Sequence, residues 1–310
     1  MLLELASLVV ALLVLAKASE YAIGHAIVVA RFLRISEMAI GFLLVSTATS
    51  MPEFFVGITA SSAGETGISV GNVLGANVAD LLLVGGATAL AGTVVLRRKE
   101  IPELLKMLFA ITVLSVIVLL PLGRFSGILL LLVFTGYAVY LLQKKVSEHM
   151  DGGRSVSRKE ALASGALFFA SMAVVVVCAN FVVSSAVAIA TAFNVSRAFI
   201  AGTLVSMGTT LPELATSVTA VRKKLSGIAI GNVVGSCITN LTLVLGAAAV
   251  VTPIRTDLPA FMNLAVFALL SCAMFWIFVK NRRLSRREGF MLLGTYALFL
   301  VSALVTELGT

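Results

Sequence analysis

Charged residues are scarce in this chain of 310 residues, in which Asp, Glu, Lys and Arg together make up 12%. Soluble domains carry about 25% of such residues, so the composition excludes a soluble enzyme, a nucleic-acid-binding module and a disordered scaffold. The three cysteines form no CxxC pair and exclude a disulfide-rich secreted scaffold. The N-terminus lacks the basic segment and cleavage site of a signal peptide, so we expect the first apolar stretch to remain as a membrane span.

Apolar residues are abundant instead, at 59% of the chain with a mean hydropathy of +1.08. Because a membrane-crossing helix needs about 20 apolar residues, we expect an all-α integral membrane protein with ten transmembrane helices. Ser36 and Ser196 are expected N-caps, and Pro102 and Pro259 fit the first turns of helices. The expected spans are 2–30, 37–61, 67–96, 103–122, 125–142, 161–192, 197–221, 227–251, 257–279 and 288–306.

Basic residues predict the orientation of these spans. When alternate loops are assigned to opposite sides, eighteen Lys and Arg residues fall on one side and three on the other. Lys and Arg concentrate in cytoplasmic loops, so the rich side, which includes Arg97–Lys99 and Arg222–Lys224, is expected inside. We therefore expect a multi-pass protein of the cell membrane with both termini extracellular. The net charge of +8 then reflects topology and predicts no nucleic-acid partner.

Self-comparison reveals an internal repeat. With a shift of 160 residues, 44–86 aligns with 204–246 without a gap, and eighteen of the 43 positions are identical, including a Pro-Glu pair and a Gly-Asn pair. Each half holds five expected spans, an odd number, so the second half must enter the membrane from the opposite side. Inverted repeats of this kind are typical of secondary transporters with a substrate site at the membrane midplane. We expect two inverted five-helix repeats, 1–142 and 160–310, joined by a cytoplasmic connector at 143–159.

Oxygen-bearing side chains repeat on one face of the second and seventh spans, with the spacing i, i+3, i+4 and i+7. Glu53 and Glu213 end these faces, and a carboxylate deep in a membrane span is functional by default. Pro52 and Pro212 lack an N–H and should each break a helix, freeing nearby carbonyls to face an ion. The two faces consist of Ser46, Thr49, Ser50 and Glu53 and of Ser206, Thr209, Thr210 and Glu213.

The third and eighth spans supply a second face at a spacing of four residues. Gly231 and Gly235, with their counterparts in the first half, should allow close helix approach. Carboxylates, hydroxyls, amides and carbonyls together suit hard cations such as Ca²⁺ or Na⁺ rather than zinc or copper. The residues of this second face are Asn72, Ala76 and Asp80 in the first half and Asn232, Ser236 and Asn240 in the second.

The two motifs resemble the paired alpha-repeats of the sodium/calcium exchangers, in the cation/calcium antiporter superfamily. The resemblance rests on Thr49-Ser50-x-Pro52-Glu53, on Gly208-Thr209-Thr210-x-Pro212-Glu213, and on the Gly-Asn-x-x-Gly block that follows each motif. The short connector resembles that of short prokaryotic-type members, which lack the Ca²⁺-sensing domains of animal exchangers. The resemblance implies Ca²⁺ exchanged for Na⁺ by alternating access, without an enzyme activity or a cofactor. The implied partners are these ions and the lipid bilayer, and no protein partner can be inferred.

The resemblance also implies roles for individual residues. Glu53 and Glu213 would hold Ca²⁺ together with carbonyls at Thr49 and Thr209. The flanking Na⁺ sites would use Ser46, Ser50, Ala76, Asp80, Ser206, Thr210, Ser236 and Asn240.

Three departures from the family pattern bear on the number of Na⁺ ions bound rather than on the overall activity. Ala48 stands where the family usually has Gly, and Ala76 stands where it usually has Ser. The acid of the Asp80/Asn240 pair lies in the first half, whereas related chains often have it in the second.

Three alternatives remain open at the level of sequence. A proton/calcium antiporter of the same superfamily would share the fold, although its motifs usually read Gly-Asn-x-x-Glu. An intramembrane hydrolase would need an aspartate dyad, whereas the duplicated acid here is Glu beside hydroxyls. A passive cation channel would be built from rings around an axis, which the inverted duplication disfavours.

Overall fold

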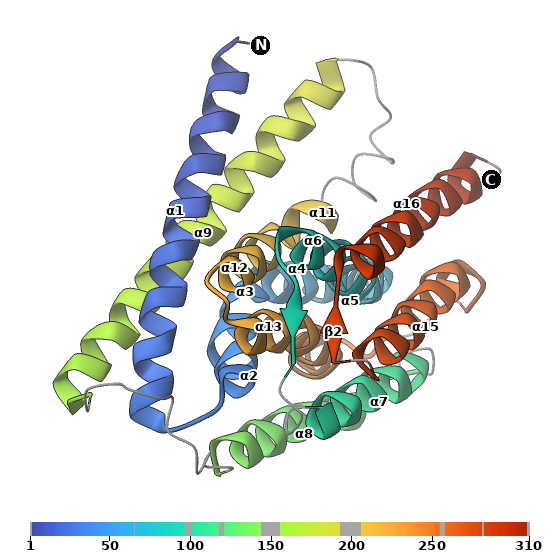
Figure 1. Cartoon of the computed structure of the whole chain (residues 1–310). Helices are drawn as coiled ribbons and strands as arrows, with labels where there is room; N and C mark the ends of the chain where they lie inside the picture. The colour runs from blue at the N-terminus through green and yellow to red at the C-terminus, as the bar shows by residue number, and fades with distance from the viewer. Residues whose placement is uncertain are drawn as a thin grey trace.

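The structure, a computed structural model, is almost entirely helical (Figure 1). It describes residues 2–64, 66–96, 101–117, 121–143, 156–192, 206–254, 258–280 and 282–308. The elements are α1 (Leu2–Leu33), α2 (Glu37–Ile40), η1 (Gly41–Ser46), α3 (Thr47–Thr49), α4 (Met51–Ser62), α5 (Thr66–Ala79), η2 (Asp80–Val84), α6 (Gly85–Ala91), β1 (Val94–Val95), α7 (Ile101–Ile117), α8 (Arg124–Gln143), α9 (Arg158–Ala192), α11 (Ser206–Thr209), α12 (Leu211–Arg222), α13 (Ser226–Thr239), η4 (Asn240–Val244), α14 (Leu245–Val251), α15 (Leu258–Lys280), β2 (Arg283–Leu284) and α16 (Arg286–Leu308).

Each of the ten expected apolar segments contains a helix or a series of consecutive helices. Within the described ranges, five helices are long and apolar enough to cross a membrane, and the bent pair formed by α2–α3 and α4 would make a sixth span. Shorter apolar stretches occur in α7 and α15, at Leu104–Leu114 and Leu264–Phe278. The helical membrane architecture is therefore confirmed, while the count of ten spans stays a prediction.

Local signals placed several helix starts correctly. The Ser36 side chain caps α2 by accepting a hydrogen bond from the Ala39 amide nitrogen at 3.1 Å. Pro102 and Pro259 lie in the first turns of α7 and α15, where a missing N–H costs no helical hydrogen bond. The expected cap at Ser196 and residues 144–155 of the expected connector fall outside the described residues.

The elements of the two motifs occupy the centre of the molecule (Figure 1). There α4, α5, α12 and α13 lie close together, and α1 and α9 run along one side of them. The helices α1 and α9 have 32 and 35 residues and pack against each other, which agrees with the long spans expected at 2–30 and 161–192. On the other flank α8 packs on α14, and α16 packs on α6.

Glycines let the central helices approach within backbone contact. A Cβ atom built on Gly231 would lie 2.4 Å from the carbonyl oxygen of Met38, which no real side chain tolerates. A Cβ atom on Gly235 would lie 2.8 Å from the Ser46 hydroxyl oxygen. The predicted close approach is therefore confirmed at both positions, and it brings α13 against α2 and η1, which precede the first motif.

Short strands also pair at matched positions, a departure from the purely helical expectation. Val94 of β1 pairs with Leu284 of β2 in an antiparallel register. Ile254, which lies 160 residues after Val94, forms an isolated antiparallel bridge with Leu122. Each pairing joins a segment of the first half to a segment of the second.

Candidate cation site between two broken helices

Both motif helices break at the last hydroxyl residue of each face, Ser50 or Thr210, two residues before the proline. In the first half, the helices before and after Ser50 are bent by 48°. In the second half, Thr210 separates α11 from α12, and its ψ of 1° resembles the 10° of Ser50. Pro52 and Pro212 lie in the first turn of the following helix, where each lacks the N–H that would bond the carbonyl four residues earlier. The breaks predicted from the prolines are thus present.

The two motif glutamates are buried and meet at the centre. Glu53 and Glu213 are each 1% exposed, and their carboxyl groups lie close enough for their charges to interact. The Ser50 hydroxyl, from the helix break beside Glu53, donates to Oε1 of Glu213 at 3.3 Å. Thr209, from the second half, lies near the Glu53 carboxyl. Each half therefore extends its hydroxyls toward the carboxylate of the other half.

Most of the acidic oxygens at this centre have no hydrogen-bond partner in the part of the chain that the structure describes. Among the described residues, no hydrogen bond reaches either carboxylate oxygen of Glu53, Oε2 of Glu213 or Oδ1 of Asp80. A buried polar atom without a partner costs about 1–3 kcal/mol, and more when it is charged. Such atoms in a native structure call for an explanation. A cation that these oxygens bind would provide it.

Two equivalent asparagines hold the backbone of the glutamates in place. The Asn72 amide nitrogen donates to the Glu53 carbonyl oxygen at 3.2 Å, and the Asn232 amide nitrogen donates to the Glu213 carbonyl oxygen at 3.2 Å. Asn232 also accepts a hydrogen bond from the Thr49 hydroxyl at 3.3 Å. These bonds connect α5 to α4 and α13 to α12, so the second face positions the first.

Asp80 and Asn240 contact each other although they lie 160 residues apart. The amide nitrogen of Asn240 donates to Oδ2 of Asp80 at 3.5 Å, and both side chains are 1% exposed. Each residue begins a π-helical turn, η2 or η4. Such turns occur frequently at functional sites. Asp80 also lies close enough to Glu53 and Glu213 for their charges to interact.

Two hydroxyls of the motif faces, those of Ser46 and Thr210, point their protons at the helix backbone. The hydroxyl of Ser46 donates to the Phe42 carbonyl at 2.5 Å, and that of Thr210 donates to the Met207 carbonyl at 3.0 Å. A hydroxyl has one proton and two lone pairs, so each oxygen keeps acceptor capacity for a cation.

The remaining predicted residues differ in what they bring to the centre. Ser236 donates to Oε1 of Glu213 at 3.5 Å, whereas Ala76 is fully buried and has no polar side-chain atom. Of Ser206, the structure describes the backbone at the start of α11 but not the side chain.

The described residues contain no group of three or more His, Cys, Asp or Glu side chains arranged to hold one metal ion. A cation between Glu53 and Glu213 must therefore take its further ligands from hydroxyls, amides and backbone carbonyls. Cys178, Cys237 and Cys272 are free and buried, as expected for packing residues.

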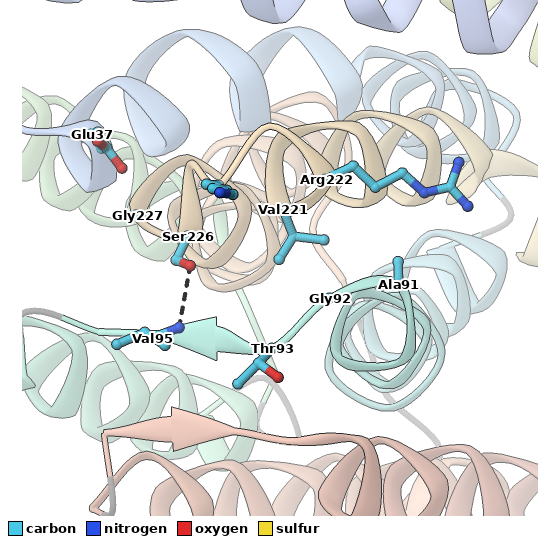
Figure 2. A pocket seen from close by; sticks show the side chains of 10 residues that line it. Glu37, Ala91, Gly92, Thr93, Val95, Val221, Arg222, Ser226 and Gly227 are labelled. Carbon is cyan, nitrogen blue, oxygen red and sulfur yellow. Dashed lines mark hydrogen bonds between the residues drawn. The ribbon is translucent and has the colours of Figure 1, made fainter.

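A cavity of about 580 Å³ lies away from this centre (Figure 2). It opens between the α12–α13 connection and the α6–β1 connection, where the Val95 amide nitrogen donates to the Ser226 hydroxyl at 3.2 Å. None of the predicted site residues lines it. The candidate site is therefore the closely packed cluster of acids and not this cavity.

Sequence reasoning missed Asn77, which contributes to the same cluster. Its side chain accepts a hydrogen bond from Asn240 at 3.2 Å. The available signal was its place in the repeat, because Asn77 aligns with Cys237 and lies three residues before Asp80.

Comparisons with known proteins agree with this geometry. The chain is similar to the inner membrane protein YrbG of Escherichia coli K12, with 30% identity covering 97% of this chain and 96% of that protein. It is 28% identical to the sodium/calcium exchanger MaX1 of Methanosarcina acetivorans, covering 95% and 96% of the two chains. A solved structure of the sodium-calcium exchanger NCX_Mj, soaked with Na⁺ and without Ca²⁺, superposes with a TM-score of 0.83 at 25% identity, covering 97% of this chain and 99% of that one.

A family model described as sodium/calcium exchanger protein matches residues 3–143 and 163–305. These two ranges together include every element that carries the candidate site. The chain belongs to the sodium/calcium exchanger family of membrane transport proteins, which are not enzymes and move Ca²⁺ and Na⁺ without a cofactor.

Proposed function

We propose that the protein is a secondary antiporter that moves Ca²⁺ in exchange for Na⁺ by alternating access, with the ions bound between Glu53 and Glu213. One observation carries this proposal: two buried glutamates on equivalent broken helices keep three of their four carboxylate oxygens without a partner in the described structure. Two carboxylates match the charge of one Ca²⁺, and buried charges are tolerated when they are paired in this way. The names of MaX1 and NCX_Mj as sodium/calcium exchangers support the choice of ions.

The proposed architecture is ten spans in two inverted halves, 1–142 and 160–310, with a cytoplasmic connector at 143–159. Contacts between residues 160 positions apart support this arrangement, because a residue near a two-fold axis lies next to its own counterpart. Asp80 contacts Asn240 at 3.5 Å, and the Asn77 side chain contacts the Cys237 carbonyl at 3.4 Å. Ions between the halves could then be exposed to one side at a time.

The proposed ligands divide between the two ions. Ca²⁺ takes six to eight oxygen ligands. In this proposal the carboxylates of the two glutamates and the backbone carbonyls of Thr49 and Thr209 are its main protein ligands. The other proposed ligands serve Na⁺, with Ala76 able to offer only its carbonyl. These are Ser46, Ser50, Ala76, Asp80, Ser206, Thr210, Ser236 and Asn240.

A proton/calcium antiporter is the second candidate, and Asp80 is the observation that favours it. Its Oδ1 has no partner among the described residues and could carry a proton as readily as it could bind Na⁺. Both candidates use the same fold and the same glutamates, so the coupling ion must be tested directly.

The first prediction concerns the coupling ion. The assay uses proteoliposomes with separately imposed gradients of Na⁺, K⁺ and H⁺. We expect an outward Na⁺ gradient to drive Ca²⁺ uptake, because Na⁺ that enters the site between Glu53 and Glu213 displaces Ca²⁺. Radioactive ⁴⁵Ca²⁺ uptake measures this. Uptake driven by the H⁺ gradient alone would select the second candidate. Uptake that ignores every opposing gradient would indicate a channel and overturn antiport altogether.

The second prediction concerns orientation. The three native cysteines are buried, so a single cysteine introduced by Gly152→Cys should be the main reactive thiol. We expect an impermeant maleimide to label it only after cells are opened, because the basic loops place this connector inside. A cysteine introduced by Ser62→Cys, on the opposite side in the proposed topology, is the matched control and should be labelled from outside. Labelling of the Gly152→Cys variant in intact cells would refute the proposed orientation.

A further inference from the structure

Asn77 links the two halves of the protein beside the acidic cluster. It lies at the end of α5, three residues before Asp80, and is 1% exposed. Its amide nitrogen donates to the backbone carbonyl of Cys237 at 3.4 Å, and its Oδ1 accepts from the amide nitrogen of Asn240 at 3.2 Å. Both partners belong to the second half, so one side chain of the first half contacts two neighbouring turns of the other.

These contacts fix the orientation of two amide groups. A backbone carbonyl can only accept a hydrogen bond, so the atom of Asn77 that faces Cys237 must be its amide nitrogen. Asn77 therefore presents its oxygen to Asn240. The atom of Asn240 that faces this oxygen must be its amide nitrogen, because an oxygen there would face another acceptor. The orientation of both side chains thus follows from a single main-chain carbonyl.

The orientation of Asn240 determines what the adjacent acid can bind. Because the nitrogen of Asn240 faces Asn77 and Oδ2 of Asp80, its oxygen lies on the other side of the amide. Oδ1 of Asn240 and Oδ1 of Asp80 are both buried without a partner in the described structure. A reversed amide would put N–H donors in place of that oxygen and would oppose a cation. The present orientation leaves one neutral and one acidic oxygen available.

We propose that Asn77 is a positioning residue for the coupling cation: it holds the Asn240 amide so that Oδ1 of Asn240 and Oδ1 of Asp80 are both available to Na⁺. In this proposal Asn77 acts through Asn240, because both ends of its amide are hydrogen-bonded to the second half. The proposal rests on the proposed function and assigns to one residue the control of Na⁺ binding beside the Ca²⁺ site.

The test is Asn77→Leu, which keeps a side chain of similar length but removes the donor and the acceptor. We expect the Na⁺ concentration that half-saturates exchange to rise about tenfold, the ratio that corresponds to about 1.4 kcal/mol. Binding of ⁴⁵Ca²⁺ without Na⁺ should remain at the wild-type level, because both side-chain hydrogen bonds of Asn77 go to Cys237 and Asn240. Equal losses of Ca²⁺ and Na⁺ binding would show a merely structural role and overturn the proposal.

A double-mutant cycle tests whether Asn77 acts through Asn240. We expect Asn77→Leu to add nothing to the Na⁺ defect of Asn240→Ala, because the group that Asn77 orients is then absent. Additive defects would overturn the proposal. Thr88→Val removes another buried hydroxyl that has no described partner, and it should leave the Na⁺ response unchanged.

A second Asn77 variant and the exchange activity of the wild-type protein separate a folding defect from a failure of either proposal. If Asn77→Leu does not fold, the second variant is Asn77→Ser, whose side chain is smaller and polar but one bond too short to make either contact of the Asn77 amide. It should show the same Na⁺ defect. Wild-type protein without Na⁺-dependent Ca²⁺ exchange would refute the proposed function itself. Normal wild-type exchange together with a normal Na⁺ response in both Asn77 variants would refute only this inference.

Discussion

Glu53→Gln and Glu213→Gln are each expected to reduce Ca²⁺ transport to the level of protein-free liposomes. Both carboxylates are buried and face the same centre, so either change leaves a bound Ca²⁺ with an uncompensated positive charge. Removing one partner of a buried ion pair costs about 3–5 kcal/mol, which corresponds to a loss of Ca²⁺ affinity of at least about a hundredfold. Initial rates of ⁴⁵Ca²⁺ uptake and equilibrium ⁴⁵Ca²⁺ binding measure the two effects.

Glu20→Gln provides the matched control for these variants. Glu20 lies on α1 with its side chain 46% exposed, and it pairs with Lys17 at 2.7 Å. An exposed ion pair contributes little to stability, so this change should leave Ca²⁺ uptake and binding at the wild-type level. Robust transport by either of the two motif variants would remove the glutamates from the centre of the mechanism.

Asp80→Asn is expected to weaken the response to Na⁺ much more than the binding of Ca²⁺. Asp80 contacts Asn240 rather than the hydroxyls that reach Glu213, and its free Oδ1 offers a negative ligand to a monovalent cation. The half-saturating Na⁺ concentration should rise at least about tenfold, as expected when a buried charged partner worth 1.4 kcal/mol or more is lost. Binding of ⁴⁵Ca²⁺ should fall by a smaller factor, because only the longer-range attraction of Asp80 is removed.

Exchanging the two residues of this pair sharpens the test. The double variant Asp80→Asn with Asn240→Asp returns one acid to the pair from the other half, and the two side chains are 3.5 Å apart. We expect it to recover part of the Na⁺ response that Asp80→Asn loses, because the new carboxylate at position 240 also faces the oxygen of Asn77. An unaltered Na⁺ response in Asp80→Asn would exclude Asp80 from coupling.

Features that depend on local sequence were predictable. Pro52 and Pro212 predicted the helix breaks because a missing N–H acts on the carbonyl four residues earlier whatever the surroundings. The spacing that ends at Glu53 and Glu213 predicted two polar faces because helical geometry alone decides which side chains share a face. The repeat then indicated that the two faces lie together, and the hydrogen bond from Ser50 to Glu213 joins them.

Features that depend on contacts between distant segments were not predictable. No local pattern distinguishes Asn77 from other buried amides, and its importance lies in bonds to residues about 160 positions away. The π-helical turns at Asp80 and Asn240 add one residue to a helical turn without a proline or glycine signature at that point. The pairing of Val94 with Leu284 likewise joins residues 190 positions apart in the sequence.

The most direct test of the central claim is equilibrium binding of ⁴⁵Ca²⁺ to the purified wild-type protein, titrated with Na⁺. A single site between the two glutamates predicts that each chain binds one Ca²⁺ and that this Ca²⁺ is released completely as Na⁺ is added. More than one tightly bound Ca²⁺ per chain, or Ca²⁺ that stays bound at saturating Na⁺, would contradict a single site between Glu53 and Glu213 that the two ions occupy in turn.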